Sequence, residues 1–131
     1  MAGLQVLEDH YRARGFRVLA FYSNNFGKQG GSDEQIAEVT KKYRVEYDQF
    51  AVGPVVGDDA RATFKWLLSH DNPGPMEGAV TPKWNFFKYL ISRSGQLVAA
   101  FDTPTYPGDD PTAPAWIDCV MTKAIEAELA K

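Results

Sequence analysis

Residues 16–35 read FRVLAFYSNNFGKQGGSDEQ, and this stretch decides the fold. Residues 16–22 are nearly all apolar, which is typical of a strand covered on both faces, as in a parallel sheet. The polar, glycine-containing residues 23–31 then predict a loop. Ser32, with Gln35 three positions later, forms a capping-box pattern that predicts the start of a helix. A strand, a loop and a helix in this order favour an α/β arrangement.

The chain before this stretch predicts a helix. Leu4, Leu7 and Tyr11 fall at helical spacing, and Gly15 follows at the position expected just past a helix end. A helix that packs on a parallel sheet normally crosses over from a preceding strand. The printed sequence starts with this helix at Met1, so we expect the leading strand of the sheet to be absent from these residues.

The chain after this stretch predicts a further strand, a helix, a hairpin and a last helix. The expected elements are a short strand over residues 47–52, a helix capped by Asp58 or Asp59, hairpin strands over residues 86–91 and 96–101, and a helix whose first turn holds Pro114. The side chains expected to face the core are Ile36, Val39, Tyr43, Ala60, Phe64, Leu67, Leu68, Ile117, Val120, Met121, Ala124, Ile125 and Leu129. This order predicts one α/β domain over residues 1–131, with a mixed sheet, flanking helices and the closing hairpin and helix of a thioredoxin-like layout.

Composition and charge argue against several classes of protein. The 131 residues are 44% hydrophobic and 24% charged, which is an ordinary globular balance. The 14 basic and 17 acidic residues give a net charge of −3, so neither a nucleic acid nor an anionic membrane is an expected partner. The longest apolar runs are far short of the roughly 20 residues that span a bilayer. Residues 1–9 lack the features of a secretory signal, so a cytoplasmic location is predicted.

Cysteine and histidine are too sparse for a disulfide framework or a metal site. Cys119 is the one cysteine in the chain and cannot form an internal disulfide. His10, His70 and Cys119 are widely separated and lack the paired spacing of zinc ligands. We therefore expect no bound metal, and the expected role of Cys119 is packing.

Two short segments could carry chemistry. The first, residues 24–29 (NNFGKQ), directly follows the predicted strand, where α/β folds place ligands. The second is Trp84, Asn85 and Phe86, whose indole and amide N–H groups can donate hydrogen bonds to a developing anion. Each segment also has a purely structural interpretation. The first would be a turn whose Asn and Gly residues supply unusual backbone angles, and the second would be a core tryptophan with an asparagine at the start of a strand.

Together, the two segments indicate a family. Residues 4–101 resemble the glutathione peroxidase family in four places. The first three are the first helix with residues 2–5 and 11–16, the strand and glutamine loop at residues 18–29, and the stretch of residues 32–50 that continues through the second helix. The fourth is the hairpin, with Lys83, Trp84, Asn85, Phe86, Lys88, Leu90, Ile91 and Gly95. The resemblance implies a thioredoxin-like fold and the reduction of hydrogen peroxide or organic hydroperoxides by a thiol, in the response to oxidative stress.

Members of this family use a selenocysteine or cysteine that is supported by a glutamine, a tryptophan and an asparagine. Carried over by motif, the catalytic residues are Gln29, Trp84 and Asn85. Donors of this kind lower the pKa of a reactive thiol and stabilise the oxygen that leaves when the O–O bond breaks. The resemblance also implies that a hydroperoxide and glutathione are the partners, with glutathione as co-substrate and no bound cofactor.

The sequence departs from the family pattern at several positions. The family's reactive residue lies a few positions before the pair that matches Leu4 and Gln5, so we expect it before Met1 and expect the printed chain to be inactive by itself. Ser23 and Thr40 stand where many members carry further cysteines, and Thr40 favours glutathione over thioredoxin as the reductant. Gly30 replaces the acidic residue that usually follows the glutamine.

A truncated selenoprotein, whose in-frame UGA codon was read as a stop, would explain the expected absence of the reactive residue. The alternative is a non-catalytic member of the family that binds a partner or small ligand. A third hypothesis makes Cys119 the nucleophile. Loss of an internal strand would leave unpaired backbone groups, so self-association is also expected.

Overall fold

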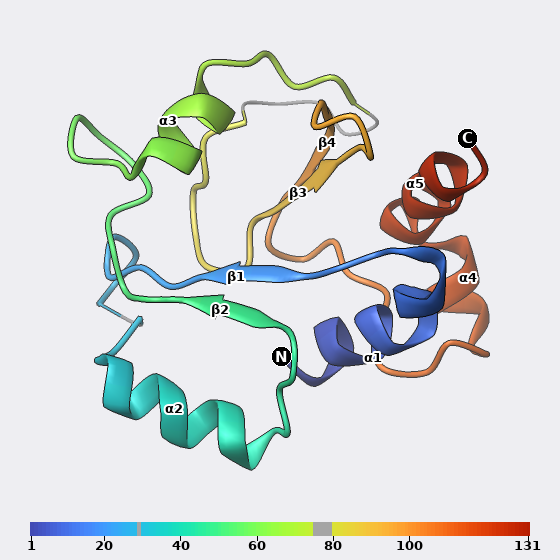
Figure 1. Ribbon diagram of the computed structural model, residues 1–131, viewed down its shortest axis with the longest axis horizontal. Helices are drawn as coiled ribbons and strands as arrows, with labels where there is room; N and C mark the ends of the chain where they lie inside the picture. Colours follow the sequence, from blue (N-terminus) through green and yellow to red (C-terminus); the bar gives the residue numbers. More distant parts are fainter. Residues whose placement is uncertain (29, 75–79) are drawn as a thin grey trace.

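The computed structural model describes residues 1–28, 30–74 and 80–131, and Figure 1 shows how they are arranged. The elements in chain order are α1 (Ala2–Tyr11), η1 (Arg12–Arg14), β1 (Leu19–Phe21), α2 (Asp33–Lys42), β2 (Asp48–Phe50), α3 (Ala62–Leu68), β3 (Lys88–Ile91), β4 (Leu97–Phe101), α4 (Pro114–Asp118) and α5 (Val120–Leu129). None of the helices in these ranges is both long and apolar enough to cross a membrane.

The strands pair in two separate ladders. β1 lies parallel to β2, with Leu19 opposite Asp48 and Phe21 opposite Phe50. β3 lies antiparallel to β4, with an irregularity between Leu90 and Ile91. Within the described part of the chain, no ladder joins the two pairs. The predicted α/β class is confirmed, and its parallel and antiparallel pairings are distributed over two small sheets.

β4 lies between two hydrophobic clusters. Ala99 and Phe101 belong to a cluster with Leu7, Tyr11, Leu90, Trp116, Met121 and Ile125. Leu97 and Ala100 belong to a second cluster with Val55, Ala60, Phe64, Leu67 and Val80. In Figure 1, α1, α4 and α5 accordingly gather on one side, and α3 lies on the other side of the hairpin. β4 is therefore the strand with both faces covered.

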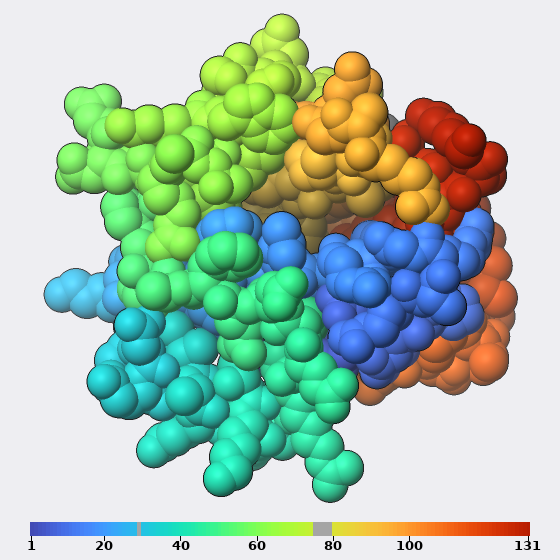
Figure 2. All heavy atoms as spheres, in the orientation of Figure 1, coloured from blue at the N-terminus to red at the C-terminus, as the bar shows by residue number. Residues whose placement is uncertain are grey.

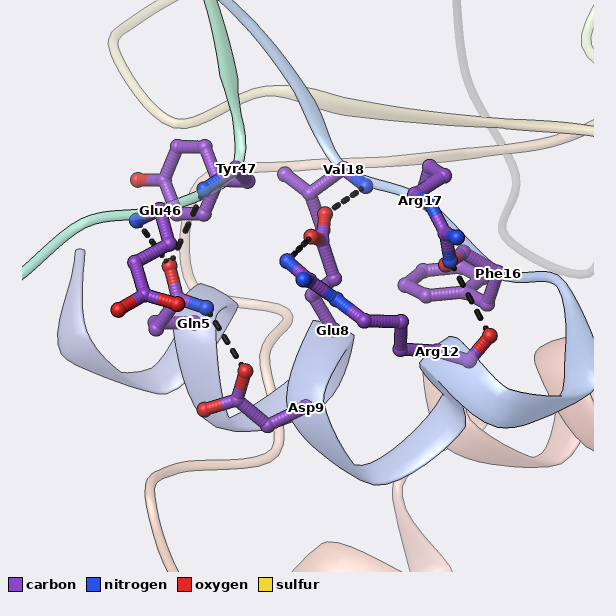
Figure 3. A network of polar contacts seen from close by, with 9 residues as sticks. All are labelled: Gln5, Glu8, Asp9, Arg12, Phe16, Arg17, Val18, Glu46 and Tyr47. Carbon is purple, nitrogen blue, oxygen red and sulfur yellow. Dashed lines mark hydrogen bonds and ion pairs between the residues drawn. The ribbon is translucent and has the colours of Figure 1, made fainter.

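Two polar side chains of α1 hold the starts of β1 and β2, as Figure 3 shows. The Gln5 side-chain oxygen accepts the backbone N–H groups of Glu46, at 2.6 Å, and Tyr47, at 3.2 Å. The Glu8 carboxylate accepts the N–H of Val18 at 2.6 Å and pairs with Arg12 at 2.5 Å. Gln5 is 8% exposed and Glu8 is 1% exposed, so these N–H groups would lack partners without them. We call these contacts the α1 clamp.

Three local signals in the sequence are confirmed. Gly15 ends the first helical segment in the left-handed region, with φ of 92°. Ser32 and Gln35 form the complete capping box of α2, with bonds of 3.2 and 2.9 Å. Gly95 turns the β3–β4 hairpin with φ of 83°. In each case the signal acts through residues close in sequence.

Two predictions of burial are wrong. β1 is shorter than residues 16–22 and is not covered on both faces, because the side chain of Leu19 lies at the surface. Val39 and Tyr43 are also exposed, and Thr40 is the buried residue of α2. Figure 2 shows α2, in cyan, at one end of the visible face. Ile36, the third residue expected in its core face, is half-buried.

The start of α3 also differs from the prediction. Arg61, not Asp58 or Asp59, is the N-cap residue, and no side chain caps the helix. The Arg61 guanidinium instead donates to the carbonyl of Ala51 at 2.5 Å and so ties the helix start to the chain after β2. The predicted core face is largely confirmed, since Ala60, Phe64 and Leu67 are buried and Leu68 is half-buried.

The predicted last helix is divided in two. Cys119 has extended backbone angles, φ −59° and ψ 134°, and separates α4 from α5. The helical period therefore does not continue across it, and Trp116 rather than Ile117 faces the core. Met121 and Ile125 are buried as predicted, Ala124 and Leu129 are half-buried, and Val120 is exposed.

The α1 clamp generates a stability prediction. Replacing Gln5 with leucine keeps most of its volume but removes the acceptor of two backbone N–H groups, so Gln5→Leu lowers the free energy of unfolding by about 2 kcal/mol. Urea denaturation followed by circular dichroism measures the loss. The matched control is Gln96→Leu, the same change at an exposed position, which stays within about 0.5 kcal/mol of the wild type. Equal midpoints for the two variants would contradict the role of the clamp.

Candidate functional site

The loop after β1 is held by its own asparagines. Asn24 bonds to both backbone groups of Gly31, at 3.1 and 3.0 Å. The Asn25 side-chain oxygen accepts the Ser23 hydroxyl at 2.7 Å and the N–H of Val55 at 2.9 Å. Both asparagines therefore have structural roles, but through side-chain hydrogen bonds; the unusual backbone angles expected of the structural interpretation occur at Gly27, Lys28 and Gly31 instead.

One of the predicted catalytic residues, Gln29, belongs to this segment of the sequence and lies outside the described residues. On either side of it, Lys28 has a positive φ of 56° and Gly30 lies close against the backbone of Ser23. A Cβ added to Gly30 would lie 2.3 Å from the Ser23 carbonyl oxygen, so this backbone arrangement requires glycine.

The second segment is a turn at residues 84–86 that leads into β3, and we call it the site turn. Trp84 is 47% exposed, so its indole can reach a bound molecule. Asn85 is half-buried, and its carbonyl accepts the Thr103 hydroxyl at 2.6 Å. Trp84 is not a core tryptophan, contrary to the structural interpretation of this segment; Trp116 has that place in the cluster with Tyr11.

The two segments meet. The rings of Phe26, in the loop after β1, and Trp84, in the site turn, have centroids 6.4 Å apart and are tilted by 51°. More than fifty residues separate them in the sequence. The fold thus brings Trp84 beside the loop after β1, and Asn85 follows Trp84 in the site turn. Their catalytic roles stay predictions.

Cys119 lies elsewhere, at the junction of α4 and α5. It is half-buried, unpaired and packed against the cluster that contains Trp116 and Met121. Its predicted packing role agrees with this position. Among the described residues, no group of three or more histidine, cysteine, aspartate or glutamate side chains could hold a metal ion.

Lys88 is a residue near the site whose chemistry the sequence analysis did not single out, although it lies within the matched hairpin motif. Its ammonium donates to the carbonyls of Asp102 at 2.8 Å and Thr103 at 3.0 Å. Burial lowers the pKa of Lys88 to about 8, and the charges that Asp102 and Cys119 can carry oppose that shift. Only the folded chain shows this environment, because the two carbonyls follow β4.

Comparisons with known proteins show the family of the chain. The family model described as "Glutathione peroxidase" matches residues 1–68. The chain is 39% identical over 97 residues to the phospholipid hydroperoxide glutathione peroxidase of Callithrix jacchus, covering 72% of this chain and 48% of that protein. It is 36% identical over 107 residues to the glutathione peroxidase-like peroxiredoxin gpx1 of Schizosaccharomyces pombe, covering 80% and 66%.

A solved structure extends the similarity over nearly all of the chain. The crystal structure of Trgpx in apo form superposes with a TM-score of 0.66 and 26% identity, covering 98% of this chain and 69% of that one. The chain belongs to the glutathione peroxidase family and has its thioredoxin-like fold. It spans about half the length of the mammalian relatives that it matches.

The site turn generates a second stability prediction. Phe86 has φ of 57°, a conformation that costs a bulky L-residue about 1–2 kcal/mol. Its side chain is 54% exposed, so both Phe86→Gly and Phe86→Ala remove few contacts. At ordinary positions alanine is the more stabilising of the two, but here glycine relieves the strain. We expect the glycine variant to be more stable than the alanine variant by about 1 kcal/mol in urea denaturation. The opposite order would show that Phe86 is unstrained in solution.

Proposed function

We propose that this chain takes part in the reduction of hydrogen peroxide or organic hydroperoxides by a thiol, with Gln29, Trp84 and Asn85 as the supporting catalytic residues. The observation that carries the proposal is the approach of Trp84 to the loop after β1, within 6.4 Å of Phe26. Membership of the glutathione peroxidase family and the names of the relatives support it.

The chemistry needs donors near a reactive anion. A thiolate or selenolate attacks one peroxide oxygen, a bond to that oxygen forms as the O–O bond breaks, and the departing oxygen takes up a proton. The indole N–H of Trp84 and the side-chain amides of Asn85 and Gln29 would stabilise the attacking anion and the negative charge on the departing oxygen. An exposed Trp84 leaves room for a hydroperoxide to approach.

We also propose that the reacting thiol or selenol comes from residues outside the 131 printed here. Cys119 packs against the core at the α4–α5 junction, which suits a structural thiol rather than a nucleophile. Thr40, where thioredoxin-dependent members carry a second cysteine, is buried and its hydroxyl bonds to the Ala37 carbonyl at 3.1 Å. Glutathione is therefore the proposed reductant. A cytoplasmic location, the absence of a bound cofactor, and the absence of nucleic-acid and membrane partners stay predictions, as does a single domain over residues 1–131.

The experiment compares the 131-residue chain with a longer chain. The gene is sequenced upstream of the Met1 codon, and any in-frame UGA there is replaced by a cysteine codon in the expressed protein. Glutathione-dependent consumption of hydrogen peroxide, coupled to NADPH oxidation, is then measured. We expect turnover only in the longer chain. An upstream region with no such codon would favour the non-catalytic alternative, and turnover that Cys119→Ser abolishes would assign the reaction to Cys119.

Variants of the longer chain test the named residues. Trp84→Phe removes the indole donor and is expected to lower kcat/KM by about 100-fold, as is Asn85→Ala. The matched control is Trp66→Phe on α3, since Trp66 is 41% exposed and lies outside the site. Unchanged turnover in Trp84→Phe would remove the tryptophan from the mechanism.

Self-association is a separate proposal supported by the open sheet edges. In the described part of the chain, β1 and β3 each pair with one strand, and Leu19 presents an exposed apolar side chain on β1. Light scattering at rising protein concentration is expected to show dimers or larger species. Leu19→Lys shifts the population to monomers, whereas Ile117→Lys, at an exposed position on α4, does not. A wild type that stays monomeric would contradict the proposal.

A further inference from the structure

Lys88 connects the hairpin to the chain that leaves it. Its side chain starts on β3, and its ammonium donates to the carbonyls of Asp102 and Thr103, just after β4. We call residues 102–105 the exit turn. The Asp102 carboxylate accepts the Thr105 hydroxyl at 2.5 Å, which closes the exit turn on itself. The ammonium is therefore bonded to a formed turn rather than to a loose segment.

The exit turn contacts the site turn. The Thr103 hydroxyl donates to the carbonyl of Asn85 at 2.6 Å. Two hydrogen bonds thus link Lys88 to Asn85 by way of Thr103. The Lys88 ammonium donates to the Thr103 carbonyl at 3.0 Å, and the Thr103 hydroxyl donates to the Asn85 carbonyl at 2.6 Å.

Local sequence does not hold the site turn in this shape. Phe86 lies between Asn85 and β3 with φ of 57°, where a bulky side chain is strained. Strained backbone persists only where surrounding contacts determine it. The contact of Thr103 with Asn85 is such a contact, and Lys88 holds the segment from which it comes.

We propose that Lys88 is a positioning residue for the site, which holds the exit turn so that Thr103 fixes Asn85 and, with it, Trp84. The purpose of that positioning rests on the proposed function, but the positioning itself does not.

The ionisation of Lys88 gives the proposal a measurable signature. Burial lowers the pKa of its ammonium to about 8, and the groups that face it with opposing charge are Asp102 on the exit turn and Cys119 at the α4–α5 junction. Bonds from a charged donor are about twice as strong as those from a neutral one. Above about pH 8 the neutral amine holds the exit turn more weakly, so the surroundings of Trp84 change.

Fluorine NMR of the 131-residue chain, labelled with 5-fluorotryptophan, measures that change. Trp84→Phe assigns the Trp84 resonance, and spectra are recorded from pH 6.5 to 9.5. We expect this resonance to titrate with a midpoint near 8. In Lys88→Arg, which keeps its charge, the resonance stays at its low-pH position, and in Cys119→Ser the titration persists. No midpoint near 8 in the wild type would overturn the proposal.

A further variant tests the path of bonds. Thr103→Val keeps the shape of the side chain but removes the hydroxyl, so the Trp84 resonance stops following the ionisation of Lys88. A titration that persists in Thr103→Val would overturn the proposal, because Lys88 would then act through space. Neither measurement requires turnover, so a failure of the peroxidase proposal and a failure of this one give different results.

Discussion

The Gln5 side-chain oxygen accepts the N–H groups of Glu46 and Tyr47, and the Glu8 carboxylate accepts that of Val18. These bonds attach one helix to the chain just before both parallel strands. Since a shift of one residue moves every side chain of a strand to the other face, these bonds support the register in which Phe21 lies opposite Phe50. Phe21 then stacks on Phe50, with ring centroids 4.4 Å apart, and meets Phe64 of α3 at 5.5 Å.

The same helical segment also reaches the hairpin. The guanidinium of Arg93, in the turn between β3 and β4, donates to the carbonyl of Arg14 at 2.7 Å. Trp116 of α4 stacks on Tyr11 with centroids 5.7 Å apart. α1 therefore holds the β1–β2 sheet, and its Leu7 and Tyr11 pack in one cluster with Leu90, Ala99 and Phe101 of the β3–β4 sheet. The meeting of Phe26 with Trp84 follows from this shared support, although no ladder joins the two sheets in the described residues.

The sequence alone predicted the local features that depend on residues close to one another in the chain. The capping box of Ser32, the end of the first helical segment at Gly15 and the hairpin with Gly95 all involve residues within a few positions. The prediction of a helix cap at Asp58 or Asp59 was wrong, because the helix starts after Arg61, whose guanidinium bonds to the distant Ala51 carbonyl. The predictions of burial were wrong where burial depends on packing between elements, as for Leu19. They were also wrong where Cys119 interrupts the helical period. The motif predicts Trp84 and Asn85 as site residues, and the structure adds the approach of Trp84 to Phe26 in the loop after β1.

The motif predicts which residues form the site, but it does not account for their geometry. Phe86, within the motif, has a backbone conformation that its own side chain disfavours, and the contact that holds Asn85 comes from Thr103, beyond the end of β4. The bonds that hold Thr103 come in turn from Lys88, whose environment exists only when the hairpin has formed. The arrangement of the site is therefore a property of the hairpin with its exit turn, and a chain that kept Trp84 and Asn85 without these contacts would keep the donors but not their placement.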